Sequence, residues 1–352
     1  MRLQFNDDEQ AIHDAFATFF AKECPTEVVR EAAPLGFCRD LWQKLGETGA
    51  PVMAQPENYG GGGANLRELG IVVGLAGSSI APVPLVEHAV TTRLLARLSA
   101  PETDLAQYLI SDKSAIATLA LRPISSKDST ANLLPAGAIA NTFVALHGND
   151  LIAVTSPPPL ISLANTADLP IANREIANPV IVLPDIATTA CHFSRAVSEW
   201  QALTATAICG LGQRALQIGV DYALERQQFD RPIGSFQAVQ HGLADAATEL
   251  EAAYYLCQRS LWMLGTEAEN VSDTTAQTTA QTFAAMAFLF ASEAAQRATA
   301  ASLHYHGGYG YAEEYDIGLY YRLAKGWSLI YDNPAQEYQR LADTLLGPIA
   351  VA

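Results

Sequence analysis

Two adjacent glycines, Gly307 and Gly308, are the residues of this 352-residue chain whose placement says most about its chemistry. They follow a long segment with the apolar periodicity of a helix, and they precede an acidic turn that is rich in tyrosine. Because neither residue has a Cβ atom, the backbone there can approach a flat ligand closely. The first chemistry that the sequence indicates is therefore contact with a planar molecule.

The glycine pair is the start of a longer pattern. After the pair come a third glycine followed by an aromatic residue, then an acidic residue, and then an Arg-x-x-Lys motif. The residues in this order are Gly310, Tyr311, Glu314, Arg322 and Lys325. The pattern resembles the C-terminal signature of the acyl-CoA dehydrogenase family, whose members bind FAD and desaturate acyl-CoA thioesters between Cα and Cβ. The resemblance implies that Gly307 and Gly308 line the adenine end of an FAD belonging to a neighbouring subunit.

Two histidines lie beside the glycine pair. His304 occupies the position of a glutamine in the family, and its imidazole can still donate or accept a hydrogen bond to the cofactor. His306 resembles a His-Gly-Gly variant found in one branch of the family. A lone histidine is more often structural than catalytic, and we interpret neither as a catalyst.

A second motif, Arg226-Gln-Gln-Phe229, lies between two long predicted helices, and Gln237 follows it. FAD needs a cation for its pyrophosphate, an aromatic surface for its rings and amides for its polar edges, and these three residues offer such groups. The resemblance implies the same role, because the family's Arg-x-x-Phe and downstream Gln contact FAD across a subunit boundary. The alternative is a solvated arginine with a core phenylalanine at a helix corner.

The reaction needs a carboxylate base within hydrogen-bond reach of the weakly acidic α proton, in a dry pocket. The family places this base at one of two positions. The first corresponds to Ala202, which cannot be a base, and the second follows Ile330-Tyr331 and is Asp332. Asp332 is shorter than the usual glutamate by a methylene, and its alternative role is a helix N-cap before Pro334.

The middle of the chain departs from the family pattern. Family members have Thr-Glu-Pro followed by glycine and serine, which hydrogen-bond the flavin ring and the substrate. Here the stretch from Thr118 to Ser126 reads TLALRPISS, without the threonine and glutamate in their places and without the glycine. We expect the half of the pocket that holds the flavin ring to be eroded, and the half offered to a neighbour to be kept.

Periodicity divides the chain into an N-terminal helical domain (1–113), a middle β domain (114–195) and a C-terminal four-helix bundle (196–352). A block of strands between two helical blocks predicts the α+β class and not an alternating βαβ sheet. The family has the same order. Besides a helix opened by Asn6, we expect helices at 38–49, 65–78, 84–99, 102–111, 198–226, 236–265, 274–304 and 330–346, and strands at 115–121, 142–146, 151–154 and 180–184.

Composition limits the partners. The net charge is −16, with 37 acidic and 21 basic residues, which argues against nucleic acid and against an anionic membrane surface. No run of 18 apolar residues predicts a membrane span, and the N-terminus lacks the pattern of a signal peptide. The five cysteines are scattered without a CxxC pair. We expect reduced thiols, no metal site and a cytoplasmic protein.

The chain is short for the family and resembles the shorter subunit of heteromeric enzymes of bacterial sterol and bile-acid side-chain degradation, including the segment from Trp42 to Gly49. In those α2β2 enzymes one subunit supplies the base, and the shorter one supplies Arg-Phe and Gly-Gly contacts to a shared FAD. We therefore expect an acyl-CoA dehydrogenase subunit with an unlike partner and an electron-transfer flavoprotein or similar acceptor. The alternatives are a self-sufficient homotetramer that uses Asp332 and a non-catalytic scaffold.

Overall fold

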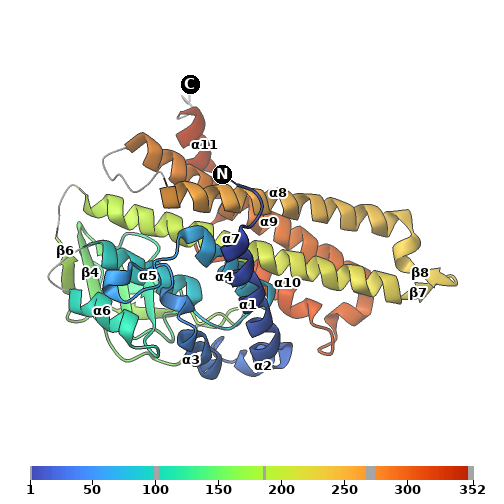
Figure 1. The fold of residues 1–352 in the computed structure, drawn as a ribbon, viewed down its shortest axis with the longest axis horizontal. Helices are drawn as coiled ribbons and strands as arrows, with labels where there is room; N and C mark the ends of the chain where they lie inside the picture. Colours follow the sequence, from blue (N-terminus) through green and yellow to red (C-terminus); the bar gives the residue numbers. More distant parts are fainter. Residues whose placement is uncertain (1, 99–102, 185–187, 267–273, 348–352) are drawn as a thin grey trace.

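Long helices carry a small β domain near one of their ends and a short hairpin at the other (Figure 1). The structure is a computed structural model that describes residues 2–98, 103–184, 188–266 and 274–347. It confirms the α+β class and the expected order of a helical part, a β part and a helical bundle.

The N-terminal part is helical where the sequence supplies caps and apolar faces. Asn6 caps α1 (Asp7–Glu23): its side chain accepts a hydrogen bond from the Glu9 amide at 2.7 Å, and the Glu9 carboxylate accepts one from the Asn6 amide at 2.9 Å. The other helices are α2 (Thr26–Ala32), α3 (Arg39–Glu47), α4 (Leu66–Ser78), α5 (Leu85–Arg97) and α6 (Thr103–Ser111). Only α2 was not expected, because seven residues are too few to show a clear period.

The middle part contains two sheets. Its strands are β1 (Ala117–Leu119), β2 (Thr130–Leu134), β3 (Thr142–His147), β4 (Asp150–Thr155), β5 (Ala172–Glu175) and β6 (Val180–Leu183). The larger sheet has the order β1-β3-β4-β6, in which β1 is parallel to β3 and the other pairs are antiparallel. The four expected strands correspond to these four. We did not expect β2 and β5, which pair separately and whose sequences are poor in β-branched and aromatic residues.

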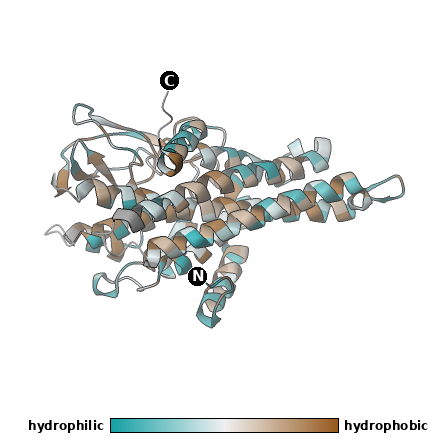
Figure 2. Ribbon diagram, turned by 90° about the horizontal axis from the view of Figure 1, so that it is seen from above, coloured by the Kyte–Doolittle hydropathy of each residue, from teal (hydrophilic) through white to brown (hydrophobic). Residues whose placement is uncertain are grey.

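The C-terminal part consists of long helices beside one another (Figure 1). They are α7 (Thr189–Glu225), α8 (Gln237–Thr266), α9 (Thr274–His306), α10 (Ile317–Leu329) and α11 (Pro334–Leu346), with the hairpin β7 (Gln227–Gln228) and β8 (Arg231–Pro232) between α7 and α8. The expected boundary at 195/196 falls inside α7. We did not expect α10, whose two glycines weaken its helical signal. Hydrophilic and hydrophobic residues alternate along these helices (Figure 2), as in helices with one face in the core.

Helices α4 and α7 touch through their backbones. A Cβ added at Gly77 would lie 2.0 Å from the carbonyl oxygen of Ala207, and one added at Gly210 would lie 2.1 Å from that of Gly74. Real Cβ atoms do not approach other atoms so closely, so only glycine permits this crossing. The contact fixes the N-terminal helices against the bundle.

A buried carboxylate adds a second link between these parts. Glu199 of α7 has no exposed surface, and its oxygens accept hydrogen bonds from Arg93 and Arg97 of α5, with Arg93 Nε at 3.2 Å. Arg195 Nε, one turn earlier on α7, lies 3.5 Å away. Burial alone would raise the pKa of Glu199, but the three guanidiniums lower it to about 2. The carboxylate therefore stays ionised and ties α5 to α7.

Gly210→Ala should lower the free energy of unfolding by about 1–3 kcal/mol, because the added methyl group overlaps a backbone oxygen in a packed interior. Gly265→Ala in α8 is the matched control, since a Cβ there meets no atom within 4 Å. Urea denaturation followed by circular dichroism measures both. Equal midpoints for the two variants would contradict the tight crossing of α4 and α7.

Candidate functional site

The loop between α7 and α8 holds Arg226 and Phe229 outside the bundle. Arg226 continues α7 in an extended conformation, and the hairpin then turns through Phe229 and Asp230, whose φ angles are +54° and +61°. A two-residue hairpin favours positive φ at both positions, but a phenylalanine there is strained. Phe229 is 87% exposed, so it is not a core residue of a helix corner. A strained and exposed aromatic residue indicates a functional surface.

The turn of Gly307 and Gly308 lies beside this loop, because the Arg226 guanidinium lies 5.4 Å from the centre of the Tyr309 ring. Gly307 has a φ of +60°, which explains its type. At Gly308 nothing in the described part of the chain requires glycine, since an added Cβ would meet no atom within 4 Å. Both glycines are exposed, so their open backbone faces away from the chain's own core.

The remaining expected contacts lie at the same end of the bundle. Gln237 is the exposed first residue of α8, and His304 is exposed on the last turn of α9. The Tyr305 hydroxyl donates to the Ala238 carbonyl at 3.4 Å and so joins the two helix ends. His306 differs from its neighbour because it is buried: its Nδ1 lies 2.7 Å from the Ser302 carbonyl oxygen.

These exposed groups form what we call the bundle-end half-site (Arg226, Phe229, Gln237, His304, Gly307 and Gly308). The set contains a guanidinium suited to a pyrophosphate, an aromatic face, an amide and an open backbone, and it therefore fits FAD. Because every member is exposed on one chain, the half-site cannot enclose a dinucleotide by itself.

The carboxylate expected as the base, Asp332, lies in the turn between α10 and α11. Its Oδ1 lies 2.7 Å from Arg122 Nη2, and its Oδ2 lies 3.3 Å from Arg340 Nη1. The Asn333 amide also donates to Oδ1 at 2.6 Å. The helix cap belongs to Asn333, whose side chain accepts from the Ala335 amide at 3.0 Å, and not to Asp332.

This environment makes Asp332 a weak base. Burial by itself would raise the pKa of Asp332, whose side chain is 9% exposed, but the Asn333 amide and the two guanidiniums hold the pKa below its usual range. A base that takes an α proton needs a free lone pair and a pKa close to the working pH. Both oxygens of Asp332 are already bound in ion pairs.

The bridge from Arg122 to Asp332 joins the β domain to the turn after α10. Arg122 Nε also donates to the Tyr331 carbonyl at 3.1 Å, so the guanidinium spans this junction. Thr118 has no exposed surface and donates to the Pro135 carbonyl at 2.6 Å, which makes it structural. Ala202, at the other base position, is buried in α7. The region in which the sequence predicts an eroded flavin half therefore contains the Arg122–Asp332 ion pair, the buried Thr118 and the buried Ala202.

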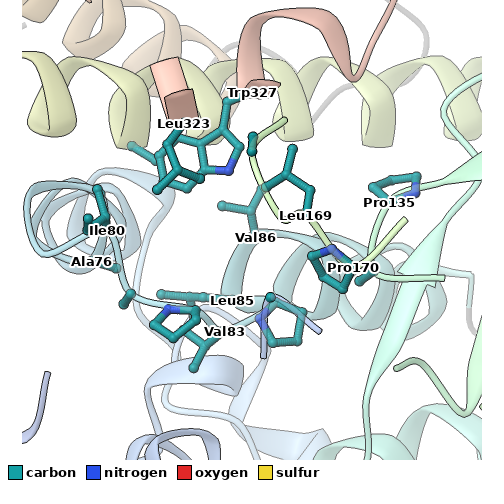
Figure 3. A pocket seen from close by; sticks show the side chains of 18 of the residues that line it. Ala76, Ile80, Val83, Leu85, Val86, Pro135, Leu169, Pro170, Leu323 and Trp327 are labelled. Carbon is teal, nitrogen blue, oxygen red and sulfur yellow. The ribbon is translucent and has the colours of Figure 1, made fainter. Parts of the chain in front are cut away.

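A cavity of about 120 Å³ lies between α4, α5, α7, α10 and the loop 167–171. Its walls are mostly apolar: Ile80, Leu169 and Trp327 point toward the same space from three different elements (Figure 3). Three charged residues line it: Asp168 and Arg322 are exposed, and Glu87 is not. Such a cavity is suited to an apolar group.

Two polar residues in this cavity escaped the sequence analysis. Glu87, in the first turn of α5, accepts a hydrogen bond from Trp200 Nε1 at 3.2 Å, and burial raises its pKa while the Trp200 hydrogen bond opposes the rise. Thr204 lies one turn after Trp200 on α7. No local signal marks either one, since Glu87 reads as a first-turn acid and Thr204 sits in an alanine-rich run.

Among the described residues, no group of three or more histidine, cysteine, aspartate or glutamate side chains could hold a metal ion. The five cysteines are free thiols. No helix in the described ranges has both the length and the apolar character to cross a membrane.

Comparison with known proteins gives consistent matches along the chain. The family model for the acyl-CoA dehydrogenase N-terminal domain matches residues 6–103, and that for the acyl-CoA dehydrogenase C-terminal domain matches residues 194–330. Acyl-CoA dehydrogenase IpdE2 of Mycobacterium tuberculosis is 33% identical over 342 residues, which cover 95% of this chain and 96% of the relative.

Solved structures of similar fold are consistent with these family matches. The ChsE4-ChsE5 complex from Mycobacterium tuberculosis has a chain with a TM-score of 0.85 and 25% identity, covering 99% of this chain and 100% of that one. A variant of the Tcur3481-Tcur3483 steroid ACAD has a TM-score of 0.83 and 25% identity, covering 96% and 98%. The chain therefore belongs to the acyl-CoA dehydrogenase family, the FAD-dependent oxidoreductases that act on a CH–CH bond of an acyl-CoA thioester.

Proposed function

We propose that this chain is the subunit of a heteromeric acyl-CoA dehydrogenase that completes an FAD site shared with an unlike partner and does not supply the base. The observation that carries the proposal is the state of Asp332, whose oxygens are paired with Arg122 and Arg340. The bundle-end half-site, in contrast, is exposed and free to meet a partner. The chain thus offers cofactor contacts outward while its own candidate base is unavailable.

The half-site residues have distinct roles in this proposal. Arg226 neutralises the pyrophosphate, Phe229 covers a ring face, and the backbone at Gly307 and Gly308 admits the adenine end. When bound, FAD accepts the hydride that leaves the β carbon of the substrate. The proton from the α carbon goes to a carboxylate of the partner subunit, because neither Ala202 nor Asp332 can take it.

The substrate class follows from the relatives. One solved relative is named a steroid ACAD, and another is a complex of two differently named chains, ChsE4 and ChsE5. We infer an acyl-CoA from steroid or bile-acid side-chain catabolism, an α2β2 assembly in the cytoplasm, and an electron-transfer flavoprotein or similar acceptor.

Two other functions are distinguishable from this one. A self-sufficient homotetramer needs Asp332 as its base and binds one FAD per chain. A non-catalytic scaffold binds no FAD in any assembly. The proposed heteromer has half as many active sites as subunits, so FAD should titrate near one half per chain when both subunits are counted.

Arg226→Ala should weaken FAD binding by the reconstituted complex about 10- to 100-fold. The reason is that a hydrogen bond between charged groups contributes roughly 1.5–3 kcal/mol. Equilibrium dialysis of FAD measures the effect. Arg297→Ala is the control, because Arg297 lies in exposed ion pairs with Glu249 and Glu293 on the bundle surface. Unchanged FAD affinity in a folded Arg226→Ala complex would remove this arginine from the site.

Asp332→Asn should leave the α,β-desaturation rate of the complex within a few-fold of wild type. Asparagine is nearly isosteric and cannot accept the proton, so a large loss is expected only if Asp332 is the base. The rate of acyl-CoA-dependent dye reduction is measured at saturating FAD. A homo-oligomer with one FAD per chain that Asp332→Asn inactivates would overturn the proposal in favour of the homotetramer.

A further inference from the structure

A buried histidine at the end of the bundle joins two helices whose last turns carry the half-site. His306 is the last residue of α9 and is 4% exposed. Its ring lies nearly parallel to that of Tyr222 in α7, with 4.0 Å between the ring centres and 19° between the planes. Stacked aromatic rings attract one another. The ends of α7 and α9 are therefore in contact through this ring pair (Tyr222 and His306).

A hydrogen bond fixes the orientation of the histidine ring. Nδ1 of His306 lies 2.7 Å from the carbonyl oxygen of Ser302, one turn earlier in α9. Because a carbonyl oxygen only accepts, Nδ1 carries the hydrogen. The ring is thus held at one edge by the helix backbone and on one face by Tyr222. An asparagine at this position can supply the donor without the ring, and a phenylalanine can supply the ring without the donor.

Two further tyrosines extend these contacts to the half-site. Tyr315 lies edge-on to both members of the ring pair, with its ring centre 5.8 Å from that of His306 and 6.2 Å from that of Tyr222. Tyr315 also lies 5.7 Å from Tyr309, whose ring is 5.4 Å from the Arg226 guanidinium. Edge-to-face and cation–π contacts both stabilise the groups that make them. A continuous set of ring contacts therefore leads from His306 to Arg226.

The ring pair lies beside both parts of the half-site. The Arg226 amide donates to the Tyr222 carbonyl at 2.8 Å, so Arg226 follows the stacked ring by one helical turn. Gly307 follows His306 directly. A change in the separation of the two rings would therefore move the guanidinium relative to the glycine turn. A ligand that bridges two exposed segments has to order them on binding, and contacts that hold the segments in place beforehand reduce this cost.

We propose that the ring pair is a positioning contact that holds Arg226 and the turn of Gly307 and Gly308 at the separation that FAD requires. This inference rests on the proposed function and extends it, because neither ring belongs to the half-site. His306 acts here through the residues beside it and takes no part in proton or hydride transfer. Its contribution is to bring together two cofactor-binding segments that are far apart in the sequence.

The first experiment needs no FAD and uses the full chain by itself. Hydrogen exchange, read by mass spectrometry, is followed in two segments, the hairpin 226–236 and the glycine turn 307–315. Each segment contains a backbone hydrogen bond whose opening exchange can detect: the Ile233 amide donates at 2.8 Å in the hairpin, and the Ala312 amide donates at 3.0 Å in the turn.

Each substitution should act on the segment that the other helix carries. His306→Asn in α9 should raise exchange in the hairpin about 3- to 10-fold, because an aromatic pair contributes free energy of this order. Tyr222→Leu in α7 should raise exchange in the glycine turn by a similar factor. A ring that only fills space in its own helix would change exchange in its own segment and not in the other.

The second experiment measures the FAD dissociation constant of the reconstituted complex by equilibrium dialysis. His306→Asn and Tyr222→Leu should each raise the constant about 3- to 10-fold. The double variant should raise it by less than the product of the two effects, because both substitutions remove the same contact. His306→Phe and Tyr222→Phe keep two stacked rings and should restore the affinity. Where His306→Asn does not fold, Tyr222→Leu compared with Tyr222→Phe gives the same information.

Three results would overturn the positioning role. They are exchange that rises only in the segment of the substituted helix, FAD affinity unchanged in Tyr222→Leu and His306→Asn, and effects that multiply fully in the double variant. Arg226→Ala separates this role from the proposed function: weaker FAD binding there, with unchanged affinity in the ring variants, removes the ring pair and leaves the subunit role intact. A complex that binds no FAD would overturn the subunit role and, with it, the positioning for FAD, while the exchange measurement would still show whether the rings couple the two segments.

Discussion

The backbone contact between α4 and α7 is the constraint on which the rest of the structure depends. Gly77 and Gly210 allow the two helices to cross without intervening side chains, so the N-terminal helices rest directly on the bundle. This closeness brings the arginines of α5 to the buried carboxylate of Glu199. It also sets the width of the apolar cavity, whose walls come from both helices. A wider crossing would open the cavity and separate the ions.

The two candidate functional regions of the chain differ in the exposure and the pairing of their charged side chains. At the end of the bundle, a strained hairpin and an open glycine turn present Arg226 and Phe229 to the outside. At the junction of the β domain with the turn after α10, Arg122 and Asp332 neutralise each other. Opposite charges at this distance favour the ionised carboxylate, and an ionised carboxylate already bound to a guanidinium has little capacity to take another proton. Exposure at one region and pairing at the other are the two observations on which the proposed subunit role rests.

The cavity illustrates a different physical principle. Apolar walls exclude water, so each polar atom within them needs a specific partner. Glu87 bonds Trp200 Nε1, whereas Thr204 Oγ1 has no hydrogen-bond partner within the described part of the chain. The cavity and the bundle-end half-site lie at different positions along α7, because Trp200 lines the cavity and Arg226 follows the last residue of the helix.

Local sequence determined the order of the elements and the composition of the half-site. The Asn6–Glu9 cap, the β-prone runs and the glycine pair are set by residues a few positions apart, so their pattern predicts them directly. Tertiary structure decided what Asp332 and Glu87 contact. Arg122 meets the turn at Tyr331 across 209 positions, and Trp200 meets Glu87 across 113. Contacts of such separation leave no periodicity in the sequence. Only the packing of α5, α7 and the β domain brings Arg122 to Asp332 and Trp200 to Glu87. For this reason the sequence alone could not predict either contact.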